Sequence, residues 1–318
     1  MCSSDLFLEL IAGADVLMEN FRPGTLERLG LSETVLRAAN PQLVIGSVTG
    51  FGKTGPWAPW PAYDLIAQAA GGGMSLTGEP DQAPVKMGVP IGDLAAGLMA
   101  SLGVVAALLG REKTGEGDTI DVSMMDTQLS LLNYHAHFYF ASGEAPGAEG
   151  DGHPNIVPYK SFPTADGRIV VAVYGDRFWP AFCRAVELEE LVDDPRFATN
   201  AMRLDNRDAL LEIIATKLVE RNRDEWQHRL VAEGVPSVPL YDVGEALTNE
   251  QAQAREMVIT VEGPDGKPMQ LIGNPIKRAR PDREVSAPPL LGRDTDAILA
   301  ELGLDRVTIE RLRVEGVV

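Results

Sequence analysis

The sequence predicts an α/β fold in which a domain built on a parallel sheet is interrupted by a smaller domain. Near the N-terminus, two strand-like runs at 14–18 and 43–48 are separated by two short helical patterns. This spacing is typical of a parallel βαβ layer with helices packed on it. Residues 142–158 consist largely of Gly, Pro, Ala and acidic residues, as in a domain boundary or a mobile loop. After this stretch, hairpins and helices replace the alternation of strands and helices.

Local start and stop patterns predict the elements of the first domain. Ser3-Ser4-Asp5 is expected to cap a short helix through Leu10. Asp93 is predicted to be the N-cap of a long Ala- and Leu-rich helix, and basic residues with Gly115 and Gly117 mark the end of that helix. The other expected elements are a strand at 14–18, helices at 25–29 and 32–39, a strand at 43–48, a Gly- and Pro-rich loop at 49–61, a helix at 62–70, a strand at 118–122 and a helix at 123–141.

The second half of the chain is interpreted as a smaller domain followed by a return to the first. The turns Ala165-Asp166-Gly167 and Pro264-Asp265-Gly266 each separate two strand-like runs, which predicts two β-hairpins. Helical patterns extend between them to about residue 250, and two short helices are expected at the C-terminus. We therefore expect a large domain over 1–154, a small domain over 155–250 and a C-terminal return to the large domain over 251–318.

The composition narrows the classes of function. A net charge of −18 would repel DNA or RNA, whereas local arginines and backbone N–H groups can still hold a small anion. The two cysteines, Cys2 and Cys183, indicate a reducing compartment and no disulfide framework. The longest apolar stretch, 94–109, ends in charged residues, which favours a buried helix over a membrane span. With no secretory signal pattern, we expect a cytoplasmic protein with no membrane partner.

Two patterns that suggest phosphate or metal chemistry fail on inspection. The loop from Gly50 to Gly55 follows a strand, but a nucleotide-binding P-loop needs glycine where Ser47 stands and must open a helix, whereas Pro56 follows. It is either a turn or a loop whose backbone approaches a ligand. His135 and His137 point to different faces of one helix, and no cluster has metal-ligand spacing, so no metal site is predicted. His153 stands out because it lies in a glycine-rich loop.

Two segments are candidates for chemistry, each with a purely structural alternative. Asp93 is either only a helix cap or a carboxylate nucleophile, which the helix dipole would hold in its ionised form. The turn after the first strand carries Asn20, Phe21 and Arg22, with Arg28 in the next helix. It is either a strand-to-helix turn with surface arginines or a binding site that combines amide, aromatic and cationic groups.

Several segments form an ordered set that extends over essentially the whole chain. They are Ala14–Gly24, Gly50-Phe51-Gly52 with Gly55-Pro56, Tyr63–Gln68, Ser75–Pro80, Gly92-Asp93, Arg111–Gly115, Asp121–Met124, His153-Pro154, Phe162–Gly167 and Pro289–Gly292. Taken together, these segments resemble those of the class III CoA-transferase (CaiB/BaiF) family, the group that includes formyl-CoA and carnitine CoA-transferases.

This resemblance implies a Rossmann-like large domain built from both ends of the chain, a small α+β domain between them, and a homodimer of interlocked subunits. It implies CoA and acyl-CoA as substrates rather than tightly bound cofactors, a small carboxylic acid as co-substrate, and Asp93 as the nucleophile. The implied CoA contacts are Asn20, Phe21, Arg22, Arg28, Val48, Thr49, Gly50 and Phe51, and the implied acyl site comprises Gly150, Gly152 and His153.

The implied mechanism is covalent. Asp93 attacks the thioester to give a mixed anhydride, and the released CoA thiolate then forms an aspartyl-CoA thioester; the acceptor acid reverses both steps. Backbone N–H groups would stabilise each oxyanion. An α-methylacyl-CoA racemase-like enzyme of the same fold is the first alternative, but Tyr63 occupies the position of its histidine, and a phenol with an ordinary pKa of about 10 is a poor base. A non-catalytic CoA-binding protein is the second alternative.

The resemblance also leads to an expectation about the front of the chain. Members of the family begin with a further strand–helix–strand portion ahead of the strand at 14–18, and here Met1–Leu6 leads directly into a helix. We therefore expect an unpaired sheet edge at or beside that strand. We also expect poor solubility or oligomerisation, and weak binding of CoA.

Overall fold

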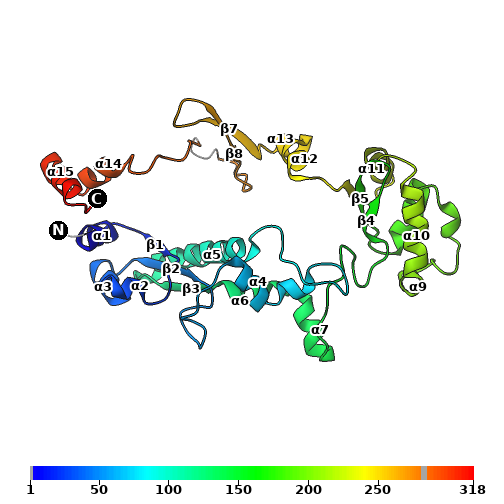
Figure 1. Ribbon diagram of the computed structural model, residues 1–318, viewed down its shortest axis with the longest axis horizontal. Coiled ribbons are helices and arrows are strands. Elements are labelled where there is room, and N and C mark those ends of the chain that lie inside the picture. The colour runs from blue at the N-terminus through cyan, green and yellow to red at the C-terminus, as the bar shows by residue number, and fades with distance from the viewer. Residues whose placement is uncertain (1–2, 281–284) are drawn as a thin grey trace. The chain divides into compact units, whose positions relative to one another are not determined.

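A computed structural model describes residues 3–280 and 285–318 (Figure 1). Its contacts divide the chain into two compact units, one made of the chain up to Gly150 together with Gly292–Val318, the other of Asp151–Leu291. The three-part division expected from the sequence, 1–154, 155–250 and 251–318, stays a prediction. Cys2 lies outside the described residues.

The first unit contains a parallel sheet with helices on both sides. Its elements are α1 (Ser3–Ala12), β1 (Val16–Glu19), α2 (Thr25–Arg28), α3 (Glu33–Ala39), β2 (Val44–Thr49), α4 (Asp64–Ala70), the 3₁₀ helix η1 (Gly73–Leu76), α5 (Ile91–Thr114), β3 (Thr119–Ser123), α6 (Met124–Leu131), α7 (Tyr134–Ser142), α14 (Thr295–Glu301) and α15 (Arg306–Val314). The strands are parallel in the order β1-β2-β3, which confirms the predicted α/β class and places β1 at an edge.

Alternate residues of the central strand β2 contact helices on opposite faces of the sheet, as the two-residue period of a strand requires. Val44 packs with Val104 and Ala107 of α5. Ile45 belongs to a separate cluster with side chains of α1 and α3. Helix α5 comes close to β3 because it has glycine at position 103, where a Cβ atom would lie 2.8 Å from Cγ2 of Ile120.

Helix α5 is longer and less buried than its sequence suggested. It runs over 24 residues. Within residues 3–280 and 285–318, it is the one helix that is long and apolar enough to cross a membrane. Core helices of soluble proteins have the same properties, and one face of α5 packs on the sheet. The opposite face is apolar and exposed, with Leu98 at 72% and Leu102 at 67%. The expected buried helix is therefore buried on one side only.

The helix predicted over 123–141 is wrong as a single element. The chain forms α6 and α7, with a break at Asn133, whose φ of 48° lies outside the helical region. Outside glycine a positive φ is uncommon, and asparagine adopts it more often than most residues do. His135 and His137 both lie on α7.

The second unit contains a three-stranded antiparallel sheet and a separate hairpin. Its elements are β4 (Tyr159–Pro163), β5 (Arg168–Ala172), η2 (Asp176–Phe178), α8 (Trp179–Ala185), η3 (Glu189–Leu191), α9 (Asn200–Asp205), α10 (Arg207–Leu218), α11 (Arg223–Ala232), β6 (Ser237–Pro239), α12 (Val243–Thr248), α13 (Glu250–Ala254), β7 (Val258–Glu262) and β8 (Pro268–Ile272). The pairs β4–β5 and β7–β8 confirm both predicted hairpins.

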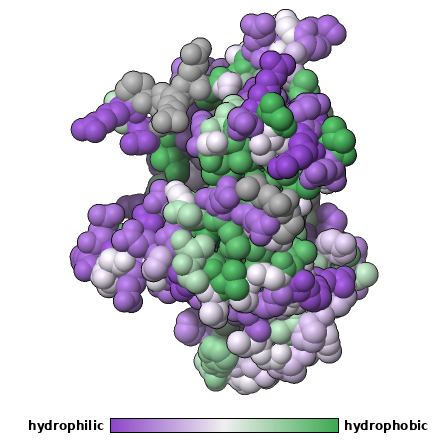
Figure 2. Space-filling view, turned by 90° about the vertical axis from the view of Figure 1, so that its left-hand side faces the viewer, coloured by the Kyte–Doolittle hydropathy of each residue, from purple (hydrophilic) through white to green (hydrophobic). Residues whose placement is uncertain are grey.

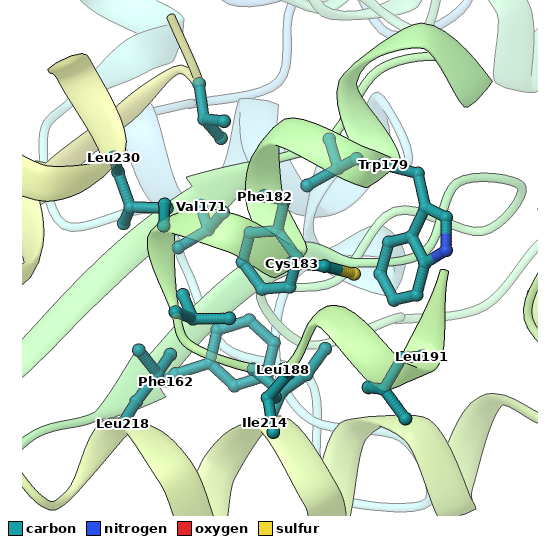
Figure 3. Close-up of a cluster of buried hydrophobic side chains, with 14 of the residues drawn as sticks. Phe162, Val171, Trp179, Phe182, Cys183, Leu188, Leu191, Ile214, Leu218 and Leu230 are labelled. Carbon is teal, nitrogen blue, oxygen red and sulfur yellow. The ribbon is translucent and has the colours of Figure 1, made fainter. Parts of the chain in front are cut away.

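A single apolar core holds the α8, α10 and α11 helices of this unit against the β4–β5–β6 sheet (Figure 3). Phe182 and Trp179 stack at its centre with ring centroids 5.8 Å apart. The Cys183 thiol lies fully buried between these side chains, and this burial raises its pKa to about 12. Cys183 is therefore a core residue rather than a reactive thiol.

The two ends of the described chain meet in the first unit. Leu6 of α1 packs with Leu299 of α14 and with Ile309 and Leu312 of α15.

Apolar residues also lie on the surface of the protein, among hydrophilic ones (Figure 2).

Candidate active site

A pocket of about 670 Å³ opens where the carboxyl ends of β1 and β2 meet the first turn of α5. The carboxyl ends of neighbouring parallel strands are the usual place for a ligand in an open α/β sheet, and this volume is within the range of small-molecule sites. The residues that line it are Met18, Glu19, Asn20, Phe21, Arg22, Pro23, Val48, Thr49, Gly50, Ala58, Trp60, Ala62, Tyr63, Asp93, Gly97 and Met124.

Asp93 is exposed to this pocket from the third position of α5, so the predicted N-cap is wrong. The N-cap residue is Pro90, which makes no side-chain cap bond. A side chain of α4 supplies the hydrogen-bond acceptor for the first turn of α5: the Gly92 N–H donates to Oδ1 of Asp64 at 2.8 Å. Surrounding protein atoms raise the pKa of Asp93 by desolvation, and the charge of Asp64 raises it further. This direction is opposite to the one expected from the helix dipole.

The turn after β1 is held by Glu19, a residue that sequence reasoning did not single out. The Glu19 side chain is only 6% exposed and lies 3.7 Å from Lys53 Nζ. It accepts the backbone N–H of Phe21 at 2.8 Å and a hydrogen bond from the Ser47 hydroxyl. The sequence feature that could have pointed to Glu19 is its place as a carboxylate at the end of the strand, next to Asn20 in the same motif. Glu19 thereby fixes the backbone that presents Asn20, Phe21 and Arg22 to the pocket.

The predicted CoA residues are only partly brought together. Asn20, Phe21, Arg22, Val48, Thr49 and Gly50 line the pocket with Asp93. Arg28 is not among the lining residues and donates instead to Oγ1 of Thr25 at 2.7 Å. Phe51 also lies outside the lining, edge-on to Trp57 and Trp60.

The loop after β2 is a turn tied to the sheet, and it does not open a helix as a P-loop would. The Gly52 N–H donates to Thr49 Oγ1 at 2.9 Å, and the Lys53 N–H donates to Asp121 Oδ2 at 2.9 Å. Trp57 and Trp60 stack with centroids 5.0 Å apart, so that Trp60 forms an aromatic wall of the pocket. The tryptophans of this loop could have indicated that wall from the sequence.

The residues predicted for the acyl site fall on either side of the boundary between the units. Gly150 belongs to the first unit, where its N–H donates to the Gly78 carbonyl at 2.9 Å. Gly152 and His153 belong to the second unit, where the His153 ring contacts that of Tyr159 at 5.3 Å. None of the three lines the pocket, and their role stays a prediction. Within residues 3–280 and 285–318, no group of three or more His, Cys, Asp or Glu side chains is arranged to hold a metal.

The fold and the pocket define an α/β protein of the Rossmann-like class, with an exposed carboxylate in the crevice at the strand ends. This chain belongs to CoA-transferase family III, because the sequence model of that family matches residues 3–295.

Individual relatives agree with this assignment. The acetyl-CoA:oxalate CoA-transferase of Acetobacter aceti is 40% identical over 273 residues, which are 86% of this chain and 69% of that protein. The succinate–glutarate CoA-transferase of Agrobacterium fabrum is 36% identical, over 96% of this chain and 76% of that protein. A crystal structure of a CaiB/BaiF family protein from Brucella suis superimposes with a TM-score of 0.83 at 38% identity, over 94% of this chain and 78% of that chain.

Proposed function

We propose that this protein transfers CoA from an acyl-CoA donor to a carboxylic acid, with Asp93 as the covalent nucleophile. The observation that carries the proposal is the presence of Asp93 in the same pocket as Asn20, Phe21 and Arg22. An exposed carboxylate beside amide, aromatic and guanidinium groups provides both a nucleophile and a binding surface for a phosphate-bearing thioester.

Each step of the reaction is an acyl substitution. The Asp93 carboxylate attacks the thioester carbonyl, the C–S bond breaks, and CoA leaves as a thiolate. The thiolate attacks the Asp93 carbonyl of the anhydride and expels the donor acid as a carboxylate. The acceptor carboxylate then attacks this aspartyl-CoA thioester, and the thiolate finally attacks the acceptor acyl group and regenerates Asp93. The covalent route divides one exchange into easier steps, and CoA binding keeps the thiolate close.

We propose that the Arg22 side chain binds an anionic group of the substrate. It lines the pocket, and it has no hydrogen-bond or ion-pair partner in the described part of the chain. Relatives are named for oxalate and for succinate and glutarate, so we propose small dicarboxylic acids as the first acceptors to test. The contributions of Arg28, Phe51, Gly150, Gly152 and His153 to binding remain part of this proposal.

We further propose that the protein acts as a homodimer. The apolar face of α5 that points away from the sheet carries Leu94, Leu98, Leu102, Val105 and Leu109, all exposed. An apolar face of this length is costly in water, and a second copy of the chain would cover it. Interlocking of the subunits and the cytoplasmic location stay predictions from the sequence.

The test of the proposed chemistry traps the acyl-enzyme. The protein is incubated with succinyl-CoA and hydroxylamine, which attacks an activated Asp93 carbonyl and leaves a hydroxamate, detected by peptide mass mapping. Asp93→Ala should abolish both this adduct and the transfer of CoA to oxalate or glutarate. Asp126→Ala is the matched control, because Asp126 is also the third residue of its helix but does not line the pocket. Normal turnover of the Asp93 variant would refute the proposal.

The same protein can be tested against the racemase alternative. Deuterium exchange at the α-carbon of a 2-methylacyl-CoA in heavy water requires a base beside the nucleophile, and the corresponding residue is Tyr63, which is 82% exposed. We expect CoA transfer without such exchange. Rapid exchange in the absence of an acceptor acid would favour the racemase, and CoA binding with neither reaction would favour a non-catalytic binding protein.

A further inference from the structure

The first turn of α5 is anchored by a side chain from another helix. Asp64, at the start of α4, uses one carboxylate oxygen to accept the Gly92 N–H at 2.8 Å and the other to accept from Gln68 Nε2 at 2.7 Å. Gln68 is 2% exposed, and its Oε1 accepts the N–H of Met87 at 2.9 Å. The same two side chains therefore hold both the first turn of α5 and the segment that leads into it.

This anchor depends on glycine at position 92. A Cβ atom there would lie 3.0 Å from Oδ1 of Asp64 and 3.4 Å from Cβ of Ala67. Since the residue that approaches Asp64 is the immediate neighbour of Asp93, the contact fixes the backbone from which the Asp93 side chain projects.

Asp64 also contributes charge at the site. The lining of the pocket includes Glu19 at the end of β1, Arg22 in the turn that follows and Tyr63 at the start of α4, together with Asp93. Strand β2 and helix α6 contribute no titratable side chain to this lining. Glu19 is paired with Lys53. Desolvation is the larger cause of the raised pKa of Asp93, and the charge of Asp64 is the second cause.

We infer that Asp64 is a positioning residue for Asp93: it fixes the turn that carries the nucleophile and places a second negative charge near it, which favours the acylated enzyme. This inference rests on the proposed role of Asp93. When the Asp93 oxygen bonds to the acyl carbon and the C–S bond breaks, the negative charge leaves with the CoA thiolate. The acylated side chain is neutral, so the repulsion between the two carboxylates ends.

The experiment measures two properties of Asp64→Asn, Asp64→Ala and the wild type. The first is the rate of hydroxamate formation at Asp93 with succinyl-CoA, and the second is the acidic limb of the pH profile of kcat/KM. Asp64→Asn keeps an oxygen for the Gly92 N–H but removes the charge and the acceptor of Gln68 Nε2, so the limb should move to lower pH and acylation should slow. Asp64→Ala also loses the anchor, and its rate should fall by up to about 10²-fold, the cost of misplacing a reacting group by ~1 Å.

Asp118→Asn is the matched control, because Asp118 also accepts a backbone N–H, from Thr119 at 2.8 Å, but precedes β3 at the end away from the pocket. It should leave both properties unchanged. If the wild type forms the hydroxamate and Asp64→Asn has the same rate and the same acidic limb, the inference is wrong and the proposed function stands. If the wild type forms no hydroxamate, the proposed function falls, and the inference with it.

A measurement on the wild type covers the case in which the Asp64 variants do not fold. The Asp93 carboxyl, assigned by comparison with Asp93→Asn, is titrated by ¹³C NMR. A pKa above the ordinary aspartate value of about 3.9 that falls when added salt screens the charge of Asp64 supports the inference. A pKa that is not raised, or that salt leaves unchanged, overturns it, because desolvation alone would then account for the value.

Discussion

At the scale of single residues, the carboxylate of Asp93 combines two properties that a nucleophile for acyl transfer needs. It is open to a pocket, and its pKa is raised by desolvation and by Asp64. A carboxylate with a higher pKa is a better nucleophile once ionised, provided that the working pH lies above that pKa. The first turn of α5 thus exposes Asp93 without using its oxygens as a cap.

The raised pKa predicts how transfer depends on pH. Because the ionised carboxylate attacks, kcat/KM should be low where Asp93 is protonated and should increase as pH rises through its pKa, which lies above the ordinary aspartate value. The measurement is the initial rate of CoA transfer between pH 3.5 and 8, with stability followed by circular dichroism at each pH. A flat profile across the acidic range, with the protein folded throughout, would contradict an ionising nucleophile with a raised pKa.

A second prediction at this scale concerns Arg203, which is fully buried in the second unit. It donates to the carbonyls of Val157 and Phe197 and to Asp176. Arg203→Met fills much of the same space but leaves two carbonyls without their donor, and each unsatisfied group costs about 1–3 kcal/mol. We expect a clear loss of stability in urea. Arg184→Met is the control, because Arg184 is exposed and its side chain pairs, within the described part of the chain, only with Glu233; an equal effect of both changes would contradict the prediction.

At the scale of elements, helix α5 connects the sheet to the site. Gly103 allows α5 to lie against Ile120 of β3, whereas Gly110 of the same helix has nothing within 4 Å of a Cβ position. The same substitution should therefore have opposite effects at these two sites.

Gly103→Ala should destabilise the first unit, because overpacking costs about 1–3 kcal/mol and the gain in helix propensity is at most about 1 kcal/mol. Gly110→Ala should stabilise by that gain alone. The midpoints of thermal unfolding of the two variants measure the difference. A stabilising effect at both positions would mean that α5 and β3 do not come into contact at Gly103.

Periodicity and turn residues predicted most elements of this fold, because strands, hairpins and helix ends depend on neighbouring residues. The errors involve positions where distant residues decide. Asp93 has the sequence of an N-cap, but Asp64 from another helix supplies the acceptor, and no local pattern contains that contact. The break at Asn133 depends on a backbone conformation that asparagine allows but does not require.

The candidate site was predictable to a similar degree. The segments around Asn20 and Gly50 were found because a motif follows each strand, and the parallel sheet brings both strand ends to one pocket. Arg28 was expected from the family resemblance; its side chain donates to Thr25, and its contact with CoA stays a prediction. Glu19 and Trp60 lie in segments that the sequence does mark, but their contacts with Ser47 and Trp57 arise only in the folded sheet and loop.

At the scale of the whole molecule, the exposed face of α5 predicts self-association. Leu98→Asp combined with Leu102→Asp should convert the proposed dimer to a monomer, because a charge cannot be buried in an apolar interface without a partner. Neither residue lines the pocket. Sedimentation velocity at several protein concentrations measures the oligomeric state. Val307→Asp, at another exposed apolar residue, is the control and should leave the dimer intact; a monomeric wild type would contradict the prediction.

The contact of Leu6 with Leu299, Ile309 and Leu312 has a consequence for biosynthesis. Residues 299–312 leave the ribosome after the whole of the second unit, Asp151–Leu291, so the first unit cannot complete this cluster while the second is being made. Leu6 of α1, which is made first, stays without these partners until then, and contacts of such long sequence separation form slowly. The order of synthesis thus runs opposite to the order of completion: the unit begun first is finished last.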